Sequence, residues 1–246
     1  MECRNCGKIV EGNFCSHCGQ DSKVSRINLP NFFNQVSENV FILNKGFFYT
    51  LINLFIRPGH SIRDFLNGKR KYHFKPIAYL LVFSSIYFLI SRIAEQNTLI
   101  DDLVSGFFSY DPDNKNEIPP SLTWFSSNYA YTALLLLPIF SFASFIAFFK
   151  YRRSYLEHIV INAYITGQQA IFYSIFISLE IFITHDILEV IPVILSITYT
   201  FWVISQLFTE GNRIIKIFRS ILTYIIYMVL SSAFLLIFAN IKMMVG

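Results

Sequence analysis

The chain has 246 residues, of which 54% are hydrophobic and only 15% are charged, with a formal net charge of +4. Soluble domains carry about 25% charged residues, and here long uncharged runs separate the charged clusters. This pattern excludes an ordinary soluble globular protein and indicates an integral membrane protein. Residues 1–25 contain no long apolar run, so we expect no signal peptide and an N-terminus that stays where the chain is made.

The chain opens with two Cys-x-x-Cys pairs. Two such turns can aim four thiolates at one tetrahedral ion, and a glycine after each pair permits the left-handed turn that brings backbone amides toward sulfur. We therefore predict a zinc ribbon over residues 1–20, with iron of rubredoxin type or two disulfides as the alternatives. The predicted metal ligands are Cys3, Cys6, Cys15 and Cys18.

The predicted zinc site is closed and therefore structural rather than catalytic. A ribbon of this size cannot bury a core, so metal binding would supply its folding free energy. We expect it to dock a cytoplasmic protein. We expect no nucleic-acid partner, because Arg4 and Lys8 are balanced by Glu2 and Glu11 and form no basic stripe.

A linker over residues 21–28 leads into a segment, residues 29–75, that precedes the membrane spans. Apolar residues recur there at helical spacing, but the apolar run after Lys45 has only eleven residues, too few to cross a bilayer. We predict one or two amphipathic helices in the cytoplasmic interface. Packing against the bundle as a sixth, buried element is the alternative.

The stretch "RPGHSIRDFLNGKRKYHFKP" spans residues 57–76. Pro58 and Gly59 should break the preceding helix, and Ser61 with Asp64 resembles a capping box that opens a short helix closed by Gly68. The basic residues either anchor the chain by the positive-inside rule or contact anionic lipid headgroups. The predicted headgroup contacts are Arg63, Lys69, Arg70, Lys71 and Lys75.

Five predominantly apolar stretches, bounded by charged residues, lie in residues 76–246. The first is slightly short for a bilayer, and Lys75 and Arg92 can extend their side chains to the interface to make up the difference. We predict an all-α integral membrane bundle of about five transmembrane helices. The predicted spans cover residues 76–92, 125–149, 159–184, 190–209 and 220–241.

The charges that flank these spans predict their orientation. Lysines and arginines precede the first span and lie between the second and third and between the fourth and fifth, whereas the other two loops are acidic. Since basic loops stay in the cytoplasm, we predict a cytoplasmic N-terminus and an external C-terminus in a bacterial inner membrane. The thiolates would then lie in a reducing compartment, as a zinc ribbon requires.

The third predicted span carries polar residues at close to helical spacing, so one face of the helix is polar along its length. That face should point into the bundle. Hydrogen bonding between helices, a polar path or ligand groove, and a catalytic pair of Glu157 and His158 are the three interpretations. The residues concerned are Glu157, His158, Asn162, Thr166, Gln169, Tyr173 and Glu180.

The ribbon, the 57–76 stretch, "YLEH" and "YTFWVISQLFTEG" together resemble an uncharacterised bacterial membrane protein family, domain of unknown function 3667. The resemblance runs through nearly the whole chain, and the Arg-Pro-Gly segment of that family corresponds to Arg57 to Arg70. Five spans with a cytoplasmic head are also similar, more loosely, to Yip-type membrane proteins. The resemblance implies a fold and no mechanism.

The predicted function is that of a non-enzymatic inner-membrane protein with a cytoplasmic zinc-binding head for partner docking or assembly. One alternative is a transporter or lipid-handling protein that uses the polar face of the third span. The other is a membrane lipid enzyme that uses Glu157 and His158.

Overall fold

The structure is a computed structural model that describes residues 1–24, 27, 45–98, 100–102, 124–125, 127–183, 185 and 187–245. Of the segment over residues 29–75, in which one or two amphipathic helices are predicted, residues 29–44 lie outside these ranges. The named helices are α2 (Lys45–Ile56), α3 (Pro58–Leu66), α4 (Pro76–Ile93), α7 (Tyr129–Ala147), the 3-10 turn η1 (Phe149–Tyr151), α8 (Tyr155–Glu180), α9 (Ile187–Leu207) and α10 (Arg213–Val245).

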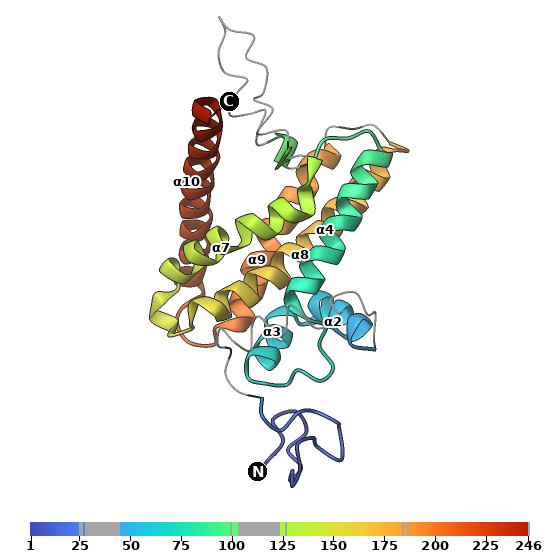
Figure 1. The fold of residues 1–246 in the computed structure, drawn as a ribbon, viewed down its shortest axis with the longest axis vertical. Coiled ribbons are helices and arrows are strands. Elements are labelled where there is room, and N and C mark those ends of the chain that lie inside the picture. The colour runs from blue at the N-terminus through green and yellow to red at the C-terminus, as the bar shows by residue number, and fades with distance from the viewer. Residues whose placement is uncertain are drawn as a thin grey trace, which may run out of the picture.

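The helices α4, α7, α8, α9 and α10 run between the same two ends of the molecule (Figure 1). One end holds the N-terminal head, the loop before α4 and the turns that precede α8 and α10. The other end holds the turns after α4 and α8, and α10 ends there. Basic residues therefore gather at the end that carries the head, among them Lys69, Lys71 and Arg152, and acidic residues such as Glu95 and Glu189 gather at the opposite end.

Among the described residues, four helices are long and apolar enough to cross a membrane: α4, α7, α9 and the Arg213–Phe238 part of α10. They fit a multi-pass membrane protein. The helix α8 has 26 residues, about 39 Å at 1.5 Å per residue, and runs end to end with the others. The amide side chains and the glycine of α8 lower the mean hydropathy of this helix, so α8 is not among the four candidate membrane helices.

Three helices begin earlier than the sequence predicts, and the smallest difference is that of α9, which begins at Ile187 rather than at residue 190. The helix α8 begins at Tyr155 rather than at residue 159, because Ser154 and Glu157 form a capping box. The helix α10 begins at Arg213 rather than at residue 220. Its basic residues lie inside the helix because their side chains reach backbone carbonyls of neighbouring segments: Lys216 donates to the Phe208 carbonyl and Arg219 donates to the Ala147 carbonyl, at 2.7 Å.

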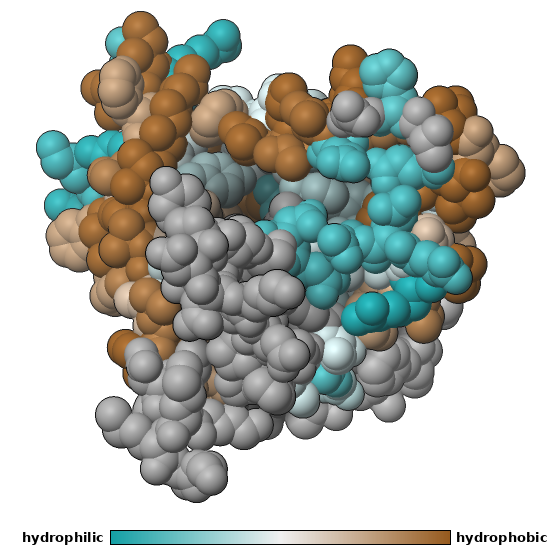
Figure 2. Space-filling view, turned by 90° about the horizontal axis from the view of Figure 1, so that it is seen from above, coloured by the Kyte–Doolittle hydropathy of each residue, from teal (hydrophilic) through white to brown (hydrophobic). Residues whose placement is uncertain are grey.

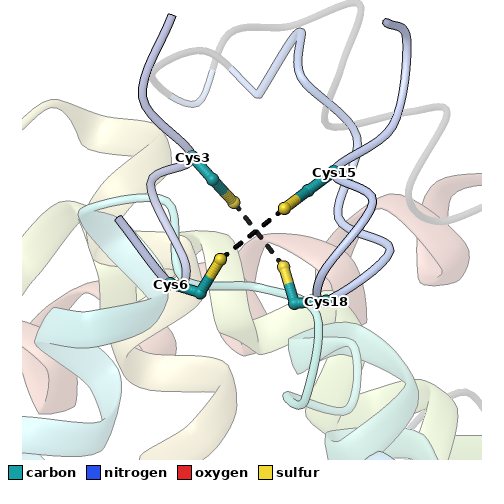
Figure 3. A group of neighbouring side chains, drawn as sticks. All are labelled: Cys3, Cys6, Cys15 and Cys18. Carbon is teal, nitrogen blue, oxygen red and sulfur yellow. Dashed lines mark hydrogen bonds between the residues drawn. The ribbon is translucent and has the colours of Figure 1, made fainter. Parts of the chain in front are cut away.

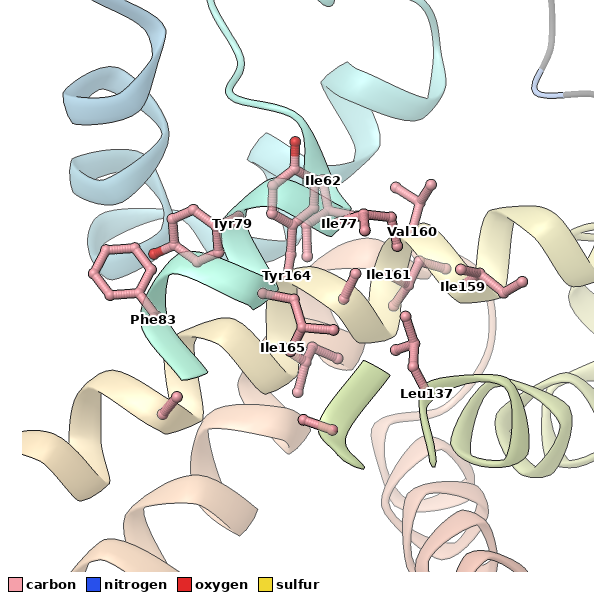
Figure 4. Close-up of a cluster of buried hydrophobic side chains, with 14 of the residues drawn as sticks. Ile62, Ile77, Tyr79, Phe83, Leu137, Ile159, Val160, Ile161, Tyr164 and Ile165 are labelled. Carbon is pink, nitrogen blue, oxygen red and sulfur yellow. The ribbon is translucent and has the colours of Figure 1, made fainter. Parts of the chain in front are cut away.

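The core lies where α8 crosses α4, α7 and α3 (Figure 4). Ile161 and Ile165 of α8 and Leu80 of α4 are at most 1% exposed. Gly167 permits the close crossing, since a Cβ there would lie 2.6 Å from the Tyr79 ring. The Tyr79 hydroxyl donates to Gln168 Oε1 at 2.6 Å, so the crossing also carries a buried hydrogen bond.

The short helix α2 has two apolar sides. Phe47, Thr50 and Leu54 are buried against the bundle, and Thr50 Oγ1 accepts a hydrogen bond from the Phe74 amide at 2.7 Å. Phe48 and Ile52 lie on the other side and are more than half exposed. The helix is thus packed on the bundle while presenting an apolar surface outward.

The helix α3 packs directly against the last turn of α9. A Cβ at Gly59 would lie 2.4 Å from the Val203 carbonyl oxygen and 2.5 Å from the Leu207 amide, so only glycine fits there. The Gly59 amide donates to Gln206 Oε1 at 3.0 Å, and Arg63 donates to the carbonyls of Gln206 and Leu207. The guanidinium of Arg63 therefore satisfies carbonyl groups that the end of α9 leaves without helical partners.

The predicted capping box of Ser61 and Asp64 is wrong. The helix α3 begins at Pro58 with a proline in its first turn, which suits a position whose amide would have no helical partner. Ser61 lies buried inside the helix, and its hydroxyl lies 3.2 Å from Nε2 of His73. Gly68 does follow the end of the helix, as predicted, and it has a left-handed backbone at φ 101°.

Candidate metal centre and neighbouring sites

The four cysteines of the head converge on one point (Figure 3). Their sulfur atoms all lie within 4.8 Å of one another, and Cys3 and Cys18, like Cys6 and Cys15, have sulfurs 3.6 Å apart. Four sulfurs in one small volume are close enough to hold a metal ion. An all-sulfur set of this kind suits zinc or iron and excludes magnesium and calcium, which bind oxygen ligands.

Each Cys-x-x-Cys pair forms the same tight turn. Gly7 and Gly19 have φ of 74° and 70°, which confirms the predicted left-handed turns. Each glycine amide donates to the carbonyl of the first cysteine of its pair, at 2.8 Å. An isolated antiparallel bridge flanks each turn, Glu2 with Ile9 and Phe14 with Asp21. Local backbone geometry therefore sets the sulfur positions without a hydrophobic core.

The electrostatics of the cluster favour a bound cation. Backbone amides at Cys18 and His17 favour the Cys15 thiolate and lower the pKa of that thiol to about 6. An amide at Lys8 favours the Cys6 thiolate too, but burial and the neighbouring sulfurs oppose it, and the pKa of Cys6 rises to about 12. Without a cation, repulsion between neighbouring thiolates prevents all four thiols from ionising. A bound divalent ion offsets this repulsion and lets all four ionise.

The head rests on the loop between α3 and α4. Gln20 is 4% exposed, and its Oε1 accepts hydrogen bonds from the Arg70 and Lys71 amides at 3.0 and 3.1 Å. A Cβ on Gly68 would lie 2.8 Å from the Arg4 side chain. The folded head and the basic loop are therefore in direct contact.

The five basic residues that are predicted to contact headgroups have different surroundings in the structure. Arg63 binds the end of α9. Arg70 is partly buried, lies over the Phe65 ring and donates to the Phe65 carbonyl at 3.2 Å. Lys69 is exposed and pairs with Asp64 at 2.9 Å. Lys71 is exposed beside the head, and Lys75 is half-buried at the start of α4. Arg63, Arg70 and Lys75 thus present little free surface to a headgroup.

His73 lies in this loop between two aromatic rings. Its ring centroid is 5.2 Å from that of Tyr49 and 5.8 Å from that of Phe65, both edge-on. In the described part of the chain, its Nδ1 is buried with no hydrogen-bond partner. Burial lowers the pKa of His73 to about 4, although the Asp64 carboxylate acts in the opposite direction.

We expect the pH dependence of unfolding to include His73. An unfolded histidine takes up a proton near pH 6.5 and folded His73 only near pH 4, so the unfolded chain binds more protons between these values. Its contribution to the free energy of unfolding is complete above about pH 6.5 and falls by up to ~3 kcal/mol toward pH 4. Detergent unfolding at pH 7.5 and pH 5 measures this fall.

His73→Gln should reduce the pH dependence, and His60→Gln should leave it as in the wild type, since His60 is exposed on α3. Equal pH dependence in both variants would contradict the assignment to His73.

The polar face of α8 divides into two halves. In the half toward the head, Asn162 Nδ2 donates to Ser144 Oγ at 2.8 Å, and Nδ1 of His158 lies 2.8 Å from the same oxygen. All three residues are at most 3% exposed. This half is a packed, hydrogen-bonded contact between α8 and α7.

Glu157 has a structural role at the start of α8. Its carboxylate accepts from the Ser154 amide at 2.8 Å and lies 3.4 Å from Nη1 of Arg153. The residue is 1% exposed. Both oxygens thus contact the first turn of the helix and the residues before it.

The other half of the polar face lines two adjoining cavities. Thr166, Gln169 and Tyr173 line a cavity of about 390 Å³ between α7, α8, α9 and α10. Tyr173 also lines a second cavity of about 240 Å³, where Glu180 lies. Among the described residues, this half of α8 therefore borders open space that a ligand could fill.

Residues 44–88 match the family model described as "Protein of unknown function (DUF3667)". The match covers α2, α3, the basic loop and most of α4. It includes Arg57 to Arg70, on which part of the resemblance rests, while the cysteine head and α8 lie outside it. No curated protein and no solved structure matches the chain.

The structure explains what the main residues of the DUF3667 segment do. Pro58 starts α3, Gly59 allows its contact with α9, and Arg63 binds the end of α9. Ile62 is fully buried beneath them. The segment is therefore a folded unit that joins α4 to α9.

Sequence reasoning missed the partners of the polar face. Ser141 and Ser144 of α7 and Tyr224 of α10 complete the contacts of Asn162 and Gln169. Their only sequence signal is a small polar or tyrosine residue within an apolar span. That signal is common and does not say which helix will be the neighbour.

Proposed function

We propose that this protein is a multi-pass protein of the bacterial inner membrane whose cytoplasmic head, held by one structural zinc ion, docks a cytoplasmic protein. The observation that carries the proposal is the four-sulfur cluster at the basic end of the bundle. Basic loops stay in the cytoplasm, and thiolates persist in a reducing compartment. Two independent arguments thus favour the same orientation, with α8 as the third of five spans.

The docking surface is formed by the loop between the two cysteine turns. Ile9 is 72% exposed and Phe14 is 66% exposed, although both lie next to the buried Val10 and Cys15. Large apolar side chains this exposed are typical of protein-binding surfaces when they occur together. The metal would hold both at a fixed position, so that binding costs little ordering of the head.

A photoreactive amino acid at Phe14 in the full-length chain tests the proposal in cells. We expect one discrete protein adduct that is lost in Ile9→Ser and in Cys15→Ser, because each change removes or unfolds the surface. Glu11→Gln is the control, since Glu11 is exposed and charged and should not anchor an apolar partner.

A periplasmic reporter fused after Gly246 should be active in the wild type and in Cys15→Ser alike. Adduct formation that persists in Cys15→Ser would contradict metal-dependent docking, and a cytoplasmic C-terminus would contradict the orientation.

A second candidate function is the handling of an amphiphile within the bundle. The cavity lined by Thr166, Gln169 and Tyr173 favours it. The packed contact at His158 and Asn162 favours binding from the lipid or the outer side over a path that runs the length of α8.

A further inference from the structure

The cavity between α7, α8, α9 and α10 lies in the half of the bundle away from the head. Its lining comes from the first part of α7 and α9 and the second part of α8. Its volume of about 390 Å³ is at the lower end of the range of about 300–1,000 Å³ typical of ligand sites. A single-chain amphiphile matches that volume better than a two-chain phospholipid does.

Most of the cavity wall is aliphatic or aromatic. Phe140 packs against Tyr227 with ring centroids 4.9 Å apart, and Leu136 and Val193 add aliphatic surface. No charged side chain is among the described residues that line it. An ion there would lose its hydration without gaining a counter-charge, so the part of the ligand inside must be uncharged.

Two tyrosine hydroxyls line this wall without a partner. Tyr129 is 6% exposed, and neither its hydroxyl nor that of Tyr227 has a hydrogen-bond partner in the described part of the chain. Neither hydroxyl counts as a buried atom, so both are open to the cavity, whereas the hydroxyl of Ser196 on the same wall is buried with no partner among the described residues. Unpaired hydroxyls at one cavity point to a ligand that carries a hydrogen-bonding group.

Gln169 supplies an acceptor on the same wall. Its Nε2 donates to Thr200 Oγ1 at 3.1 Å and to the Tyr224 hydroxyl at 3.3 Å, which fixes the orientation of the amide. Its Oε1 has no partner among the described residues and is therefore available to a donor. The cavity thus offers hydroxyls and an amide oxygen together, and an alcohol satisfies both because it donates and accepts.

The adjoining outer cavity disfavours negatively charged ligands. Asp102, Glu180 and Glu189 line it, and it shares Tyr173 and Val193 with the inner cavity. Figure 2 looks onto this end of the molecule, where hydrophilic side chains gather between hydrophobic flanks. Carboxylates at the outer side repel anionic headgroups and carboxylates of free fatty acids.

We infer that the inner cavity binds a single-chain amphiphile with an uncharged, hydroxyl-bearing head, the class to which monoacylglycerols belong. The hydrocarbon chain would lie against the rings and aliphatic side chains. The head hydroxyls would meet Tyr129, Tyr227 and Gln169. This inference specifies the ligand of the second candidate function and does not depend on the metal-binding head.

Native mass spectrometry of the full-length protein in detergent tests the inference, with 1-monooleoylglycerol as the probe. We expect saturable binding of one molecule. Oleate and lysophosphatidylglycerol, which are anionic, should bind at least tenfold more weakly, and so should a short-chain quinone, which accepts hydrogen bonds but donates none.

Tyr129→Phe and Tyr227→Phe should each weaken monooleoylglycerol binding about three- to tenfold, the equivalent of one hydrogen bond of about 1 kcal/mol. Tyr131→Phe is the matched control for Tyr129→Phe. Tyr131 lies on α7 like Tyr129, but it is 64% exposed and does not line the cavity.

Ala133→Phe should abolish binding by filling the cavity, whereas Leu135→Phe on the exposed side of α7 should not. Equal binding of the anionic probes, or wild-type affinity in both tyrosine variants, would overturn the inference. Loss of the cytoplasmic adduct in cells with unchanged lipid binding would count only against the proposed docking function.

Discussion

Cys15→Ser is expected to remove the metal from the head and leave the membrane bundle intact. Purified wild-type protein should contain about one zinc ion per chain by elemental analysis, and the variant should contain almost none. Structural zinc sites bind with an apparent 10–16 kcal/mol, and Cys15 is 2% exposed at the centre of the cluster. A neutral hydroxyl at that position can neither balance the charge of the ion nor match its preference for sulfur.

The loss should unfold residues 1–24 locally. The head buries little besides Cys3, Val10 and Cys15, so without metal it has no core to hold it. Limited proteolysis should then cut the head of the variant quickly and the helices no faster than in the wild type. The contact of Gln20 with the basic loop should be lost at the same time.

Controls distinguish the metal from its alternatives. His17→Ala should keep the zinc, because four thiolates already complete a tetrahedral site. Thiol titration after denaturation should find four free cysteines. Iron in place of zinc would correct the identity of the metal, and two disulfides without any metal would contradict the site altogether.

Gly59→Ala is expected to destabilise the whole bundle by about 3 kcal/mol. In an open helix this change would stabilise by up to about 1 kcal/mol, because alanine favours helix. Here the new methyl would meet the Val203 carbonyl and the Leu207 amide at about 2.5 Å. These atoms belong to the α9 backbone and cannot turn aside as a side chain could, so α3 would have to separate from α9.

Thermal or denaturant unfolding in detergent measures this effect. His60→Ala is the matched control, because it places an alanine on the exposed side of α3. It should change the free energy of unfolding by less than about 0.5 kcal/mol. Separation of α3 should also release Arg63 from the end of α9. A Gly59→Ala protein as stable as the wild type would mean that α3 and α9 do not meet in this way.

Much of the architecture follows from local sequence pattern. Charge-free runs of bilayer length predict the spans, because a membrane core excludes charge whatever the tertiary arrangement. The first span, predicted over residues 76–92, differs from α4 by one residue. The two Cys-x-x-Cys-Gly turns are equally local, since each sets its own sulfur positions through backbone hydrogen bonds within six residues.

Only the tertiary structure decides which partners and surroundings each polar residue has. The periodicity that puts His158, Asn162 and Gln169 on one face of α8 is a property of one helix. Whether that face meets Ser144 in a packed contact or opens onto a cavity depends on how α7 and α10 approach it. Likewise Ser61 and Arg63 look like a helix cap and a lipid contact in sequence, but they bind His73 and the end of α9. Those partners lie up to 144 residues away, and local pattern carries no information about contacts at that separation.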